Sequence, residues 1–294
     1  MNKIPVGKTI AFAYQFTFGH LGVIIGLIWI PTVLVAVGGF FAESHYGPVI
    51  MTASGGSDQA AAGQAIVSMF AWYVVSMLLT AIASTAVTRQ AMGLRKGGAM
   101  FHFALGPMEF RVFAAQMALF GVAVALALPY IVLLTAVATF AEASGAASSG
   151  ASLAAAAIGL GGAGLLLFAI VRLSFLLLPA TVAESRIGLG RSWTLTRGNF
   201  WRIVAIGLCT LGPILVVLAA GQYAILGPRY FDLALLAAHD PSSQAKIAAE
   251  QSQIMMQHLP LSFGLSLLVA PFSFGLLLAP SAYAYRVLTG SAAS

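Results

Sequence analysis

The chain has 294 residues, a formal net charge of +6 at pH 7 and a mean hydropathy of +0.95, with 60% hydrophobic and only 7% charged residues. A chain this apolar cannot bury its hydrophobic surface in one water-soluble core, so lipid has to be part of its solvent. The basic residues lie beside apolar stretches and do not form a patch with exposed aromatic residues, which argues against nucleic acid as a partner.

Six apolar stretches follow one another along the chain, each long enough to cross about 30 Å of hydrocarbon at about 1.5 Å per residue. We predict spans at Leu21–Ala42, Ala65–Thr88, Val112–Phe140, Ser152–Leu178, Phe200–Leu226 and Leu261–Tyr285. The first has the length of a full span and no convincing cleavage site, so we expect an uncleaved helix. The expected fold class is an all-α polytopic membrane protein, with a single transmembrane domain over residues 1–294.

The connections between these spans alternate in charge. Eleven of the fourteen Lys and Arg residues lie on one set of connections, and six of the eight carboxylates lie on the other. Because basic connections stay in the cytoplasm, we expect a bacterial inner-membrane protein with both termini on the cytoplasmic side. Only Arg172 falls well inside a span.

The three acidic connections differ in composition. Residues 53–63 and 141–151 are small and polar, and we expect them to be flexible. In the third, Asp240 can cap a helix that has Pro241 at its first position, until Pro260 restarts the chain. We therefore expect a short helix outside the membrane.

A sequence repeat accompanies the charge alternation. Tyr14–His20 resembles Trp193–Asn199, and Phe103–Pro107 is a weaker copy about 90 positions from each. The spacing predicts three units, 6–95, 96–185 and 186–290, each with a short interfacial amphipathic helix, a span, an external loop and a returning span. The alternative is that an apolar, glycine-rich chain produces such matches by composition.

The interfacial segments carry the candidate site. Tryptophan favours the membrane interface, and arginine can bind lipid phosphate. The predicted lipid-headgroup residues are Arg172, Arg186, Arg191, Arg197, Arg202, Trp193 and Trp201. The predicted partners are thus membrane lipids with anionic headgroups.

Arg172 is the most informative single residue, because a guanidinium within an apolar run is costly. If its span continues to Leu178, Arg172 is buried and needs a carboxylate such as Glu184 or Glu109. In the alternative, the helix leaves the bilayer sooner and the side chain extends to the phosphates.

Glu184 and Glu109 are the only carboxylates on the basic side. We predict that they form ion pairs that order the interfacial segments, with Arg186, Arg191 or Arg111 as partners.

Other patterns indicate no chemistry. The run Gly159–Gly164 matches a dinucleotide-binding pattern, but it lies inside a span with no preceding strand, so we expect close helix packing. The histidines do not occur at ligand spacing, and Cys209 is the single cysteine, so no metal site is expected. Without a catalytic set or a cofactor motif, we expect neither enzymatic activity nor a cofactor.

Two neighbouring stretches, Arg172–Glu184 and Gly190–Arg202, resemble the signature of a bacterial integral membrane family. That family includes the YciC-like proteins and the membrane domain attached to some glycerophosphodiester phosphodiesterases. The matching positions are Arg172, Glu184, Ser192, Trp193, Gly198 and Arg202. Since the hydrolytic domain of the fused members is missing here, the resemblance implies a fold and a location but no phosphodiesterase activity.

The functional hypothesis is a non-catalytic membrane module that organises lipid or a partner, either another protein or a second copy of the chain, in envelope or lipid homeostasis. The alternative hypothesis is a transporter or lipid translocator with a cavity near Arg172.

Overall fold

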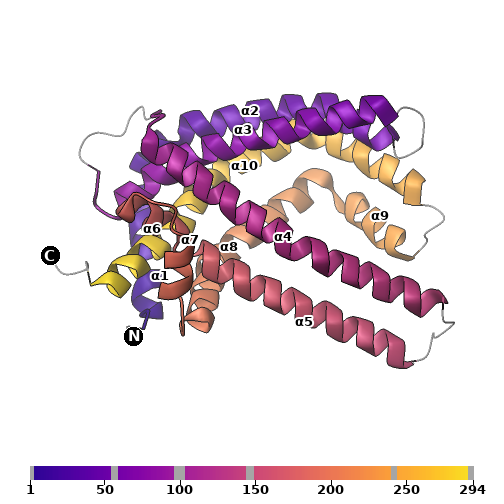
Figure 1. The fold of residues 1–294 in the computed structure, drawn as a ribbon. Helices are drawn as coiled ribbons and strands as arrows, with labels where there is room; N and C mark the ends of the chain where they lie inside the picture. Colours follow the sequence, from indigo (N-terminus) through magenta and orange to yellow (C-terminus); the bar gives the residue numbers. More distant parts are fainter. Residues whose placement is uncertain (1–2, 54–58, 96–102, 144–148, 240–243, 291–294) are drawn as a thin grey trace.

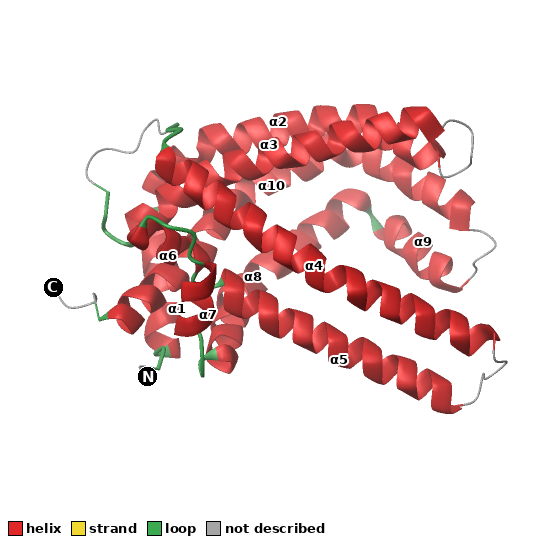
Figure 2. Cartoon of the chain, in the orientation of Figure 1, coloured by secondary structure: helices red, strands yellow, loops and turns green. Residues whose placement is uncertain are grey.

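The computed structural model describes residues 3–53, 59–95, 103–143, 149–239 and 244–290. These residues form helices and short connections and contain no strand (Figure 2). The helices are α1 (Val6–Gly19), α2 (Leu21–Ala53), α3 (Gln59–Ala91), α4 (Pro107–Ala143), α5 (Ser149–Ser174), α6 (Leu177–Glu184), α7 (Leu189–Leu195), α8 (Phe200–Leu226), α9 (Pro228–His239) and α10 (Gln244–Thr289).

Six segments of the described chain are long and apolar enough to cross a membrane. They lie in α2, α3, α4, α5 with α6, α8, and α10, in the order of the predicted spans. The structure therefore confirms the prediction of an all-α polytopic membrane protein.

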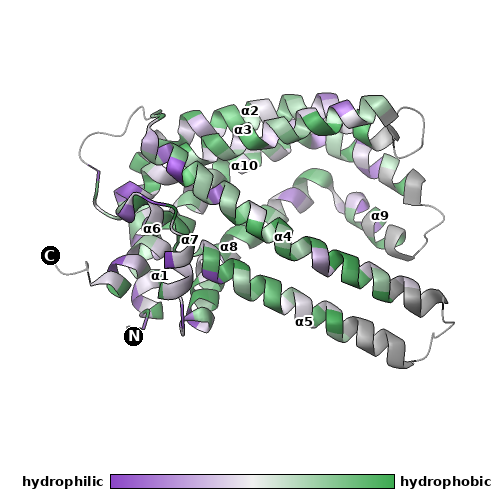
Figure 3. Ribbon diagram, viewed as in Figure 1, coloured by the Kyte–Doolittle hydropathy of each residue, from purple (hydrophilic) through white to green (hydrophobic). Residues whose placement is uncertain are grey.

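The ends of the molecule differ in composition. The short helices α1, α6 and α7 lie at one end, together with the last turns of α10, whereas α2, α4 and α9 end at the other (Figure 1). Hydrophilic residues gather around α1, α6 and α7, while the middle of α4 and α5 is mostly hydrophobic (Figure 3). We call the end formed by α1, α6 and α7 the basic end.

Helix α10 is the central element of the packing and contacts α1, α2, α3, α8 and α9. The main core joins Ile24 and Ile28 of α2 to Val87 of α3 and Leu276 of α10. Close approach depends on small residues, as it commonly does between membrane helices. At Gly275 an added Cβ would lie 2.5 Å from Oγ1 of Thr17, so this glycine allows α1 to pack against α10.

Helices α4 and α5 form a hairpin that extends away from the rest of the molecule (Figure 1). Its seam is closed by Tyr130, whose hydroxyl donates a 2.6 Å hydrogen bond to the Gly159 carbonyl. The Tyr130 ring also occupies the space that a side chain on Gly162 would need. The prediction of close helix packing is thus confirmed for Gly159 and Gly162, whereas Gly161 and Gly164 face open space.

The helices at the opposite end are longer than predicted. The segment 53–63, expected to be flexible, is helical from Gln59 onwards, and residues 54–58 lie outside the described part. Similarly, α4 reaches Ala143 and α5 begins at Ser149. Runs of alanine favour the helix, so these helices continue beyond their apolar stretches.

The prediction that Pro260 restarts the chain is wrong. Helix α10 runs through Pro260, Pro271 and Pro280 without a break. Proline is tolerated in such helices because neighbouring groups and small local adjustments satisfy the freed carbonyls. The expected capping pair Asp240 and Pro241 lies outside the described residues, and the described short helix at this end is α9.

The geometry of the repeat is regular only in part. Helix α1 precedes α2 and α7 precedes α8, but residues 103–106 before α4 are not helical. Helix α1 is amphipathic, since Lys8 and Gln15 are exposed and Ala13 is buried. The three units therefore stay a prediction.

Candidate functional site at the basic end

The chain changes direction three times between α5 and α8. Helix α5 ends at Ser174, two residues after Arg172. Pro179 explains the break, since a proline ring clashes with the carbonyl four residues before it, here that of Phe175. After α6, Ser185 adopts the left-handed conformation with φ 53°, and the chain turns into α7.

Arg172 is enclosed by the end of α7. Its side chain is only 8% exposed, and Nη2 donates a 2.5 Å hydrogen bond to the carbonyl of Trp193. Its Cζ lies 3.8 Å from the centroid of the Trp193 ring and 5.3 Å from that of Phe168. The guanidinium thus combines a cation–π contact with the negative end of the α7 dipole.

Two buried hydroxyls complete this junction. Ser192 Oγ donates to the Arg172 carbonyl at 2.8 Å and accepts from the Leu176 backbone N–H at 3.3 Å. Thr196 Oγ1 lies 3.4 Å from Arg172 Nε. The groups freed by the helix break are therefore satisfied by α7, as buried polar groups require.

The prediction of a carboxylate partner for Arg172 is wrong. Neither Glu184 nor Glu109 contacts it within the described part of the chain, where its partners are a carbonyl, a hydroxyl and aromatic rings. The alternative prediction is wrong about the side chain, which turns into the protein instead of extending outwards. Helix α5 ends at Ser174, but α5 and α6 together form one apolar span, so an early exit from the bilayer stays a prediction.

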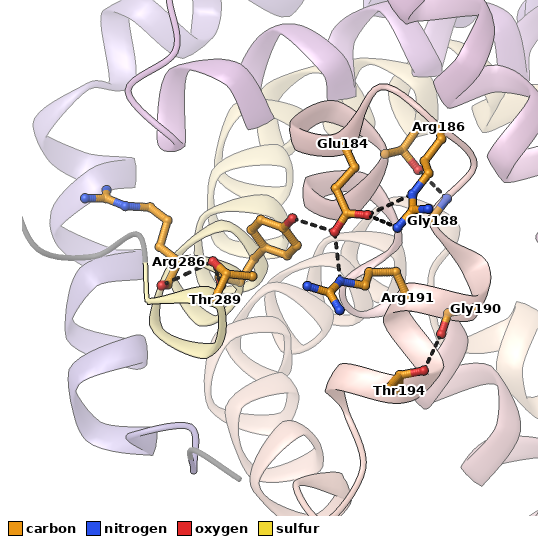
Figure 4. Close-up of polar contacts among 10 residues, drawn as sticks. Glu184, Arg186, Gly188, Gly190, Arg191, Thr194, Arg286 and Thr289 are labelled. Atoms are coloured by element: carbon orange, nitrogen blue, oxygen red, sulfur yellow. Dashed lines mark hydrogen bonds and ion pairs between the residues drawn. The ribbon is translucent and has the colours of Figure 1, made fainter.

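Glu184 joins three elements through one carboxylate (Figure 4). Its Oε2 accepts from Arg186 Nε at 2.9 Å and Nη2 at 2.6 Å, and its Oε1 accepts from Arg191 Nε at 2.8 Å. Tyr285 of α10 donates a 3.0 Å bond to Oε1. The predicted pairs with Arg186 and Arg191 are confirmed, whereas the contribution of Tyr285 was not predicted.

Glu109 has a local role. Its Oε2 accepts a 3.0 Å hydrogen bond from the backbone N–H of Gly106, and Pro107 is the first residue of α4. A carboxylate at the third helical position that binds the N-cap N–H is half of a capping box. Among the described residues we find no ion pair of Glu109, so that prediction is not supported.

Arg202 is also used inside the protein. It donates to the Ile4 carbonyl at 2.8 Å, while the Ile4 N–H donates to Oδ1 of Asn199 at 3.0 Å. Ile4 is fully buried. Arg202 and Asn199 therefore attach the segment before α1 to the start of α8.

Besides Arg186 and Arg191, three of the predicted lipid-site residues are exposed. Trp201 is 77% exposed and Trp193 is 39% exposed, and Arg197, four residues from each along the chain, is exposed as well. Within the described residues Arg197 forms no ion pair with a carboxylate.

The described residues contain no group of three His, Cys, Asp or Glu side chains that could hold a metal ion. By fold, the chain is a multi-pass α-helical membrane protein, with a buried arginine and a carboxylate cluster at one end. Comparisons of the chain with protein-family models, curated proteins and solved structures find no match.

Proposed function

We propose that the basic end binds anionic lipid headgroups, and that the protein is a non-catalytic membrane module that organises lipid. The observation that carries this proposal is the exposed Arg197, which forms no ion pair with a carboxylate among the described residues and stands between Trp193 and Trp201 in the chain. A phosphate beside Arg197 would add charge-assisted hydrogen bonds.

The aromatic residues support the same proposal. Trp201, at 77% exposed, follows Arg197 by four positions, and Trp193, at 39% exposed, precedes it by four. Tryptophan favours the headgroup layer because its ring is apolar and its N–H needs a polar partner. Arg197 and Trp201 would thus bind one headgroup and the adjacent part of the lipid.

The neighbouring arginines contribute less. Arg186 and Arg191 share the carboxylate of Glu184, so this cluster carries one net positive charge instead of two. Arg191 is 40% exposed and can offer its remaining N–H groups to a phosphate. Arg202 and Arg172 act mainly as internal supports.

Location and family belong to this proposal. The excess of Lys and Arg at the basic end favours a cytoplasmic position for that end and for both termini in a bacterial inner membrane. Membership in the YciC-like family, and a role in envelope or lipid homeostasis, are proposed on the sequence resemblance alone.

The translocator alternative receives less support. It needs an open polar cavity at Arg172, but this side chain is 8% exposed and packed against Trp193. The packing supports a structural role for Arg172, and we therefore propose Arg197 as the arginine that binds the headgroup.

The test measures lipid enrichment around the full chain in nanodiscs that contain phosphatidylglycerol and phosphatidylcholine. Each cation near a membrane surface contributes about 1 kcal/mol, so Arg197→Gln should weaken the anionic preference about fivefold. The control Arg229→Gln removes the same charge at the opposite end and should leave the preference unchanged. Equal enrichment of both lipids by the unmodified protein would overturn the proposal.

A protein partner at the same surface would give a different result. In that case the purified chain shows no lipid preference, yet Arg197→Gln still changes its oligomeric state or its recovery with a partner protein. Size-exclusion chromatography with light scattering on both variants separates the two outcomes.

A further inference from the structure

Two neighbouring cavities lie away from the basic end. The inner cavity, of about 320 Å³, lies between α2, α3 and α10. The outer cavity, of about 450 Å³, lies between α2, α8, α9 and α10. Phe263 and Ser266 of α10 line both, so the cavities adjoin each other at these two side chains.

Phe263 forms the wall between the cavities. Its ring lies against Gly39 of α2, where an added Cβ would come within 3.0 Å of Cε1. Ser262, Ser266 and Ala270 recur at intervals of four residues and present one face of α10 to the two spaces. Passage between the cavities requires the Phe263 ring to change rotamer.

The depth of each cavity follows from the helical rise. Thr32 is 11 residues beyond Leu21, the start of α2, which corresponds to about 16 Å along the axis. Glu43 is 22 residues beyond it, or about 33 Å, whereas hydrocarbon is about 30 Å thick. The inner cavity is therefore near the bilayer centre, and Glu43 is near the surface opposite the basic end.

The inner cavity is suited to hydrocarbon. Its lining is mainly apolar and includes Val35, Leu79 and Phe274. The Thr32 hydroxyl donates to the Ile28 carbonyl at 2.7 Å, as threonines in membrane helices commonly do. No hydroxyl donor of Thr32 is therefore left for a polar ligand.

The outer cavity ends in polar groups. Glu43 has no hydrogen-bond or ion-pair partner among the described residues, although the outer cavity partly encloses it. Gln222 accepts a 3.2 Å bond from Ser262 at Oε1, which leaves its amide N–H groups available. The nearby Arg229 is bound to Glu250 at 2.7 Å and so does not compensate Glu43.

We propose that the two adjoining cavities hold one phospholipid of the leaflet opposite the basic end, with a primary ammonium in its headgroup. The ammonium binds the Glu43 carboxylate, the Gln222 amide donates to the phosphate, and one acyl chain passes Phe263 into the inner cavity. Charge complementarity selects this lipid over an anionic one, because an unpaired carboxylate repels a headgroup that carries only negative charge. The volumes and the apolar lining with few polar groups match those of small-molecule sites. This site is separate from Arg197 and does not depend on the proposed function.

The first experiment needs no variant. Native mass spectrometry of the full chain, delipidated in detergent, is used to titrate phosphatidylethanolamine and its N-trimethylated counterpart, phosphatidylcholine. The trimethylated headgroup has no N–H to donate to Glu43, so its binding should be about tenfold weaker. Equal affinity for the two lipids would overturn the proposal.

Three variants locate the site. Glu43→Gln should abolish the preference for the amine lipid, whereas Asp232→Asn, which removes an exposed carboxylate of α9 that does not line the cavity, should retain it. Ser266→Phe fills the space where the two cavities adjoin and should weaken the binding of both lipids at least about tenfold. Circular dichroism and size-exclusion chromatography verify folding of each variant.

Two outcomes would overturn the proposed positions of the ammonium and of the acyl chain. If Glu43→Gln retains the preference, the ammonium is not at Glu43. If Ser266→Phe binds both lipids like the unmodified chain, the acyl chain does not enter the inner cavity. Arg197→Gln should leave the amine preference unchanged, so failure of this proposal is distinguishable from failure of the proposed function.

Discussion

The guanidinium of Arg172 lies 3.8 Å from the centroid of the Trp193 ring and donates to the backbone carbonyl of the same residue. One residue of α7 thus supplies both an aromatic face and a helix C-terminal carbonyl to a single arginine of α5. Ser192 of α7 also donates to the backbone carbonyl of Arg172. Helix α7 is therefore attached to the end of α5 through both the side chain and the backbone of Arg172. This arrangement positions Arg197 and Trp201 at the surface.

Arg172→Met should destabilise the protein by about 2 kcal/mol, because it removes a hydrogen bond between a charged group and a carbonyl together with a cation–π contact. Arg172→Lys should recover less than half of the loss, since an ammonium cannot stack on the ring and reach Thr196 at once. Unfolding in sodium dodecyl sulfate, followed by circular dichroism, measures the change. The exposed Arg197→Met is the control and should cost much less; equal losses would contradict the assigned role of Arg172.

Glu184 and Tyr285 lie 101 positions apart and are joined by a 3.0 Å hydrogen bond. Glu184→Gln and Tyr285→Phe should each cost about 1 kcal/mol, and the double variant should cost less than the sum because the interaction can be lost only once. Arg186→Gln should cost less than either, since Arg186 is 69% exposed. The same unfolding assay is applied to the two single variants and the double variant. If the losses in stability of the single variants add up to that of the double variant, the hydrogen bond contributes nothing.

The contact between α1 and α10 predicts a difference between two glycines of one helix. Gly275→Ala places a Cβ 2.5 Å from Oγ1 of Thr17 and should destabilise the protein by about 1–3 kcal/mol. Gly264→Ala meets no atom within 4 Å and should be neutral or stabilising by up to about 1 kcal/mol. Thermal unfolding in detergent compares the two, and an equal effect would mean that α1 does not pack against Gly275.

The proposed orientation can be tested by cysteine labelling. In a Cys209→Ala background, single cysteines replace Ile187, which is 50% exposed at the basic end, and Asp232, which is exposed on α9. We expect an impermeant maleimide added to intact cells to label position 232, and position 187 only after the membrane is opened. Labelling of both positions from one side would overturn the six-span topology, and the reverse pattern would overturn the orientation.

The positions of the membrane helices could be predicted because hydropathy and helix signals agree. Helix α8 has the predicted bounds, Phe200–Leu226, where Gly198 and Gly227 adopt positive φ at its two ends. The helix ends were predicted less well where the sequence becomes polar but still favours a helix. This is the case where α2 and α3 extend beyond their apolar stretches. Pro260 was misleading because a membrane helix can accommodate a proline when neighbouring groups and small local adjustments compensate for the lost hydrogen bond.

The candidate site could be predicted only where charge indicates the partner. Opposite charges seven residues or fewer apart indicated the pairs of Glu184 with Arg186 and Arg191. The partners of Arg172 are a backbone carbonyl and an indole ring, which carry no charge. Tyr285 adjoins Glu184 only through tertiary packing. Neither contact leaves a local signal in the sequence.

The exposure of α4 to lipid affects how the α4–α5 hairpin responds to bilayer thickness. None of the most apolar stretch of α4 is buried inside the protein, so lipid tails supply most of its neighbours. A bilayer of different thickness would tilt or bend these two helices more readily than the tightly packed α2, α3 and α10. Through the junction of α5 with α7, such a tilt would be transmitted to the exposed tryptophans at the basic end.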